Sequence, residues 1–90
     1  MISVVGPGTV RGGAGGLSFC VSVIGVSGAL SVYADLDGQR IRPRLPPAGT
    51  AHNGWVSMCF TLPPGSSGSL NIVVADQSGA RSRSSISVLP

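Results

Sequence analysis

Apolar and polar residues alternate along several stretches of the chain, as they do in strands that bury one face and expose the other. The clearest stretch is residues 17–24, where the odd-numbered positions are all apolar and serine or cysteine fills positions 18, 20 and 22. The same reasoning predicts strands over residues 2–5, 17–24, 30–36, 40–45, 55–62, 69–76 and 84–89.

Glycine and proline mark the turns between these strands. Asp37-Gly38 is a strong signal for a tight hairpin turn, and Pro43 makes residues 40–45 a short edge strand. The glycine-rich residues 6–16 are expected to form a flexible loop or a broken edge strand. Seven short strands with such turns predict an all-β, antiparallel sandwich. A length of 90 residues suffices for a single domain over residues 1–90.

The turns of the second half follow a particular order. The strand from Trp55 ends in Leu62-Pro63-Pro64-Gly65, and the next strand ends in Ala75-Asp76, shortly before Gly79. This order resembles the second half of bacterial and phage immunoglobulin-like domains, and the resemblance extends more loosely over the whole chain. It implies an immunoglobulin-like sandwich of about seven strands that acts as a spacer, a decoration or a binding surface in adhesins, surface enzymes or virion proteins. Unlike antibody-type domains, the chain has no cysteine pair in the second and sixth strands.

Cys20 and Cys59 fall on the outward side of two strands that are antiparallel neighbours in an immunoglobulin-like sheet. Aligning Phe19 with Phe60 on the core face places the two cysteines directly opposite each other. Opposed β-carbons lie about 4.5–5.5 Å apart, close enough for a disulfide after a small closure. Two free thiols are the alternative for a chain in a reducing compartment, and the sequence leaves both possibilities open.

Arginines recur at every second position in two places. Arg40, Arg42 and Arg44 would present three guanidinium groups on one side of an extended strand, and Arg81 and Arg83 repeat the spacing. One interpretation is bidentate contact with an acidic protein, a phosphate or an acidic glycan. The simpler interpretation is that the charges keep an edge strand from aggregating.

Residues suited to catalysis are few. His52 is the one histidine, glutamate is absent, and no Gly-x-Ser-x-Gly sequence occurs. The run from Asp35 to Gly38 resembles the start of a calcium loop but lacks the glutamate that such a loop needs, so a hairpin is expected. A metal site of His52 with both cysteines matches no compact ligand spacing. We therefore expect no enzymatic activity, no cofactor and no metal site.

The net charge of +3 is weak for a protein that binds nucleic acid, and exposed aromatic residues are few. Residues 12–34 contain no charge and could span a membrane by length alone, but their serines, glycines and alternation favour strands. We therefore expect neither nucleic acid nor a membrane as a partner.

Few charges remain to cover the outer faces of so small a sandwich. The alignment that opposes the cysteines also makes Ile24 a neighbour of Trp55, which predicts an exposed apolar patch. Further outward candidates are Val5, Val73 and Leu89. The surface expected to bind a partner consists of Trp55, Ile24, Tyr33, Arg40, Arg42 and Arg44.

These features predict a non-enzymatic structural or interaction module. The leading hypothesis is a small virion protein, a capsid decoration or tail-associated subunit, whose partner is a capsid or tail protein or a homo-oligomeric assembly. The starting Met1 without a secretion signal favours this hypothesis. The alternative is a glycan-binding or adhesive domain of a bacterial surface or secreted protein, in which Trp55, Tyr33, Asp35 and His52 line a carbohydrate platform.

Overall fold

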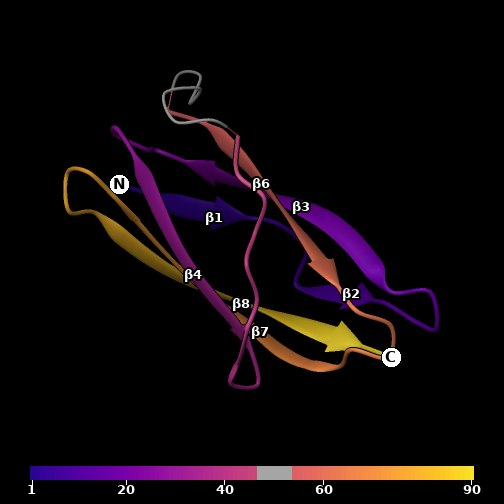
Figure 1. Ribbon diagram of the computed structural model, residues 1–90. Helices are drawn as coiled ribbons and strands as arrows, with labels where there is room; N and C mark the ends of the chain where they lie inside the picture. The colour runs from indigo at the N-terminus through magenta and orange to yellow at the C-terminus, as the bar shows by residue number, and fades with distance from the viewer. Residues whose placement is uncertain (47–53) are drawn as a thin grey trace.

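The computed structural model describes residues 1–46 and 54–90, and within these ranges it contains strands and turns but no helix. Two sheets stack as the layers of a sandwich (Figure 1). One has the strand order β1-β3-β6 and the other the order β2-β8-β7-β4-β5. The strands are β1 (Ser3–Val5), β2 (Thr9–Arg11), β3 (Leu17–Ile24), β4 (Leu30–Leu36), β5 (Gln39–Arg40), β6 (Val56–Leu62), β7 (Gly68–Asp76) and β8 (Arg81–Leu89). The predicted all-β sandwich is confirmed.

Most strands lie where the alternation predicts them. β3 and β4 have the predicted bounds, and β6 and β7 each differ by one residue at their start. β2 lies within the glycine-rich segment and pairs in parallel with β8. The uncharged residues 12–34 contribute to β3 and β4, and no helix in the described part of the chain is long and apolar enough to cross a membrane.

The predicted edge strand over residues 40–45 is wrong. β5 ends at Arg40, and Arg44 forms an isolated antiparallel bridge with Cys59 in the other sheet. Ile41, between them, is buried at 8% exposure. Burial of Ile41 and the missing N–H of Pro43 explain why the chain crosses from one sheet to the other instead of extending β5. Figure 1 shows this segment running along the side of the sandwich, so the three arginines do not form one row on one edge.

The core lies between the sheets and is made by the inward positions of both. Its largest fully buried side chains are Phe60, Met58, Leu62, Leu70, Ile72 and Ile86. Phe19 was expected to be a core residue too, but it is only partly buried and packs against the core with its ring centroid 5.6 Å from that of Phe60. The start of β3 therefore contributes less to the core than its second half, where Val21 and Val23 are buried.

Asp37 and Gly38 form the hairpin turn between β4 and β5. Their φ angles of 48° and 92° are both positive, as a type I′ turn requires. The Gly38 N–H donates to Asp35 Oδ2 at 2.9 Å, and the Ser69 N–H donates to Asp37 Oδ1 at 3.2 Å. Both carboxylates therefore hold the turn and its contact with β7, and the predicted hairpin is confirmed.

Asp76 holds the turn between β7 and β8. Its Oδ1 accepts hydrogen bonds from Ser78 Oγ (2.6 Å), Ser78 N (2.9 Å) and Ala80 N (3.2 Å), while Oδ2 accepts one from Ser27 N (3.0 Å). The Ser78 hydroxyl and the Ser27 N–H lower the pKa of Asp76 from its ordinary value of 3.8, against the opposing effect of burial. The bond from Ser27 also ties the connection between β3 and β4 to this turn.

The stability of the chain should therefore depend on pH through Asp76. A folded-state pKa below the unfolded value of 3.8 means that the ionised carboxylate stabilises the fold at higher pH, and that this contribution is lost as the pH falls through the folded pKa. We expect Asp76→Asn to melt at a lower temperature than the wild type at neutral pH and to lose less on acidification. Thermal melts from neutral pH down to about pH 2 test this. An equal loss in both proteins would contradict it.

Candidate functional site

The two sheets differ in charge. β1, β3 and β6 contain no charged residue, whereas every arginine and aspartate lies in the five-stranded sheet or in residues 37–44. We call the outer surface of the three-stranded sheet the uncharged face and that of the five-stranded sheet the basic face. The two faces point in opposite directions because they cover the two layers of one sandwich (Figure 1).

The uncharged face carries an apolar patch formed by Val5, Ile24 and Trp55. These side chains are 54%, 44% and 48% exposed. Val5 belongs to β1, Ile24 to the end of β3, and Trp55 directly precedes β6. The pairing of β3 with β6 ends at Val23 and Val56, so Ile24 and Trp55 are the next residues in that register. The patch therefore extends across three neighbouring strands.

A disulfide joins Cys20 and Cys59 on the same face. The register opposes the two residues, as the alignment of Phe19 with Phe60 predicts. The N–H and C=O of Cys59 bond to Arg44 on its other side, so the cysteines form a pair without mutual backbone hydrogen bonds. In such pairs the side chains approach more closely than in hydrogen-bonded pairs. The sequence pattern thus places the two sulfurs where a bond between neighbouring strands can form.

The basic face has an excess of positive charge. Its outward positions hold Arg11 of β2, Arg40 of β5, and Arg81 and Arg83 of β8. The one carboxylate among these positions is Asp35. The guanidinium of Arg40 lies over the ring of Tyr33, with Cζ 4.9 Å from the ring centroid, which is a cation–π contact.

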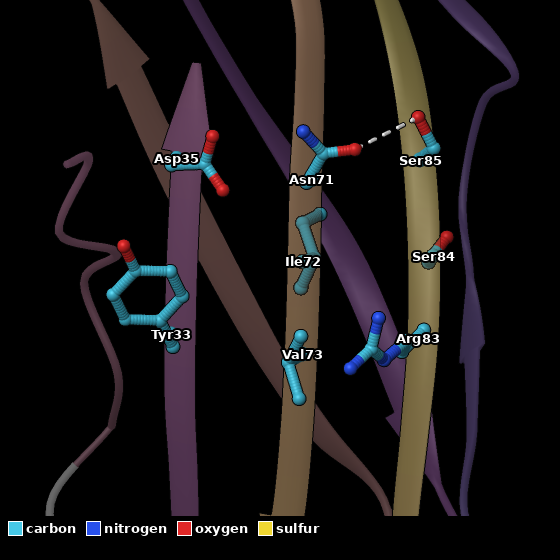
Figure 2. A pocket seen from close by; sticks show the side chains of 8 residues that line it. All are labelled: Tyr33, Asp35, Asn71, Ile72, Val73, Arg83, Ser84 and Ser85. Atoms are coloured by element: carbon cyan, nitrogen blue, oxygen red, sulfur yellow. Dashed lines mark hydrogen bonds between the residues drawn. The ribbon is translucent and has the colours of Figure 1, made fainter. Parts of the chain in front are cut away.

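An open hollow of about 610 Å³ lies on the basic face above β4, β7 and β8. Figure 2 shows its side chains on these three strands, with the Arg83 guanidinium reaching from β8 toward Val73 and the Tyr33 ring on the other side of Val73. The pairing places Tyr33, Val73 and Arg83 in one row across the sheet, and Asp35, Asn71 and Ser85 in the next. Ser85 Oγ donates to Asn71 Oδ1 at 3.5 Å.

The predicted partner-binding residues are divided between the two faces. Trp55 and Ile24 lie together on the uncharged face, whereas Tyr33 and Arg40 lie on the basic face. Arg44 is exposed at the edge of the three-stranded sheet, beside Cys59. Arg42 is exposed on the connection between the sheets. These residues therefore cannot act as a single contact surface.

The predicted carbohydrate platform is not assembled either. Tyr33 and Asp35 are neighbours on β4, but Trp55 belongs to the opposite face, and His52 lies outside the described residues. Of the further outward candidates, Val5 belongs to the apolar patch, while Val73 forms part of the hollow. Leu89 is partly buried at the end of β8.

Sequence reasoning missed Asn71 and Arg83 as partners of Tyr33 and Asp35. These residues come from three strands, and only the order β8-β7-β4 makes them neighbours. The sequence does contain one signal for them. Asn71 and Arg83 each lie between residues that face inward, which places their own side chains on the outer face. In residues 1–46 and 54–90, no three histidine, cysteine, aspartate or glutamate side chains converge as metal ligands do.

The chain has the immunoglobulin-like fold. A solved structure of the M1 domain from titin superposes with a TM-score of 0.62, and the match covers 99% of this chain and 93% of the titin domain at 8% sequence identity. So low an identity shows the shared fold alone. No protein-family model matches the sequence. A comparison with curated proteins likewise finds no match.

Proposed function

We propose that the chain is a non-enzymatic docking module that binds a protein surface through its uncharged face. The division of charge between the two sheets carries this proposal. Charged side chains on a sheet face oppose association with other proteins, and β1, β3 and β6 have none. An uncharged sheet face with an exposed aromatic residue has the composition of the buried centre of a protein interface.

The apolar patch would supply the contact area. Val5, Ile24 and Trp55 are each about half exposed, so a partner surface can remove further apolar area from water. Arg44, exposed at the edge of the same sheet, would lie at the rim of the contact. A rim arginine on a chain of net charge +3 would steer the module onto an acidic surface rather than provide most of the affinity.

We further propose that the partner surface is that of a virion, on which the chain serves as a capsid decoration or a tail-associated subunit. A disulfide between two strands is compatible with the surface of a particle that meets an oxidising environment. The resemblance to phage immunoglobulin-like domains supports the same placement. A bacterial surface or secreted protein is the alternative location.

Self-association of the isolated chain tests the uncharged face, because an unpartnered apolar patch should bring copies together at high concentration. We expect Trp55→Ser to weaken this association about tenfold or more, as for a central aromatic contact. Tyr33→Ser is the matched control, since Tyr33 is 47% exposed and Trp55 48%, but on opposite faces. Light scattering over a concentration series measures the effect.

Two outcomes would contradict the proposal. The wild type could stay monomeric up to millimolar concentration, which would leave the patch without an attraction for protein. Alternatively, Tyr33→Ser could relieve association as strongly as Trp55→Ser, which would assign the contact to the basic face.

A further inference from the structure

We propose that the hollow on the basic face binds a carboxylated sugar residue, with Arg83 contacting its carboxylate and Asp35 and Asn71 contacting its hydroxyl groups. This site lies on the sheet opposite the uncharged face and is independent of the proposed docking contact.

The shape follows from the row Tyr33, Val73 and Arg83. Neighbouring strands lie 4.7–4.9 Å apart, so the two outer residues of the row are separated by about 10 Å, wide enough for a six-membered ring. Val73 between them is small and partly buried, and it provides an apolar floor. Arg40 stacks on the Tyr33 ring and helps to hold it as a wall.

The charge of the face selects an anionic ligand. Arg11, Arg40, Arg81 and Arg83 project from it against the single carboxylate of Asp35. In Figure 2 the guanidinium of Arg83 points over the floor of the hollow rather than away from it. A guanidinium in this position can bind a carboxylate through two parallel hydrogen bonds.

The other polar groups of the hollow select a ligand with hydroxyl groups. Asp35 offers the carboxylate oxygen that does not accept the Gly38 N–H, Asn71 offers the donors of its amide group, and Tyr33 offers its hydroxyl. A sugar hydroxyl donates and accepts at once, so it can satisfy such a mixed set. A simple inorganic anion would use the arginine but leave these groups to water.

An extended acidic peptide suits the hollow less well. The backbone groups of β7 are used by its pairing with β4 on one side and β8 on the other, so a peptide cannot join the sheet at this place as an added strand. Its own backbone groups would then find no main-chain partners in the hollow, and an acidic peptide would bind mainly through charge. The affinity for a peptide and the affinity for a sugar acid should therefore respond differently to substitutions in the hollow.

Titration of the full chain with tetragalacturonate, followed by amide chemical shifts, tests the site. We expect shifts centred on Val73 and Ser84, and we expect Arg83→Gln to weaken binding about tenfold, the loss of one charge-assisted pair. Arg11→Gln is the matched control, because it removes the same charge from the same face outside the hollow. It should weaken binding less than about twofold.

Two further probes separate recognition of the sugar hydroxyls from attraction of the carboxylates by positive charge. The methyl ester of tetragalacturonate keeps the hydroxyls without the carboxylates and should bind at least about tenfold more weakly. Tetraglutamate keeps the carboxylates without the hydroxyls and should also bind more weakly than the sugar acid. The proposal is overturned if no probe shifts these amides at millimolar concentration, if tetraglutamate binds as tightly as tetragalacturonate, or if Arg11→Gln and Arg83→Gln have equal effects.

Discussion

Replacing Cys20 and Cys59 together by serine should lower the free energy of unfolding by about 4 kcal/mol, the loop entropy expected for so long a closed loop. The two residues are 39 positions apart, so the bond removes many conformations from the unfolded chain. Serine leaves no cavity, because both side chains lie on the outer side of the sheet and Cys20 is exposed. Urea unfolding of the oxidised wild type and the double variant measures the difference.

A neighbouring serine pair provides the control for this experiment. Ser22 and Ser57 oppose each other on the same two strands, one step along the same face. The double change Ser22→Ala with Ser57→Ala should cost less than about 0.5 kcal/mol, as for surface positions without special contacts. If the cysteine variant also costs less than about 1 kcal/mol, the bond does not stabilise the fold as the loop argument requires.

Truncation of Phe60 to alanine should destabilise the fold by about 3–5 kcal/mol, the range for removing a large core side chain. Phe60 has no exposed surface and lies on β6, in the centre of the predicted pairing with β3. Its ring also stacks on that of Phe19. Equilibrium unfolding in urea, with the disulfide intact in both proteins, isolates the packing effect.

Phe19 is the internal comparison for Phe60. It faces the same side of the sheet but is only partly buried, so Phe19→Ala should cost clearly less than Phe60→Ala. A larger loss for Phe19 would mean that the core is centred nearer the start of β3 than the structure places it.

The alternation of apolar residues predicted the strands that bury one face. β3 and β4 could be bounded correctly because their inward positions are apolar from end to end. β8 begins three residues earlier than predicted, at Arg81. Serines fill its first inward positions, so the alternation does not show this part of the strand, and only its pairing with β7 reveals it. β2 is too short to show a period and is defined by its parallel pairing with β8.

The candidate sites were predictable only where they depend on one pair of strands. The positions of Cys20 and Cys59, and of Ile24 and Trp55, follow from aligning two apolar patterns. The prediction of a single row of arginines is wrong because the chain passes from one sheet to the other after Ile41. Local alternation of apolar and polar residues does not reveal such a crossing. The hollow depends on three strands from distant parts of the sequence, and their lateral order is a property of the whole fold.

Under the proposed placement on a virion, the most direct test of docking is hydroxyl-radical labelling of the purified particles, read by mass spectrometry. Trp55 and Tyr33 are almost equally exposed in the isolated chain and lie on opposite faces, so each serves as the reference for the other. We expect Trp55 to become protected on the particle by about tenfold while Tyr33 stays reactive, because an aromatic residue in the middle of an interface is fully desolvated. Equal labelling of Trp55 in the particle and in the isolated chain, or protection of Tyr33 instead, would contradict it.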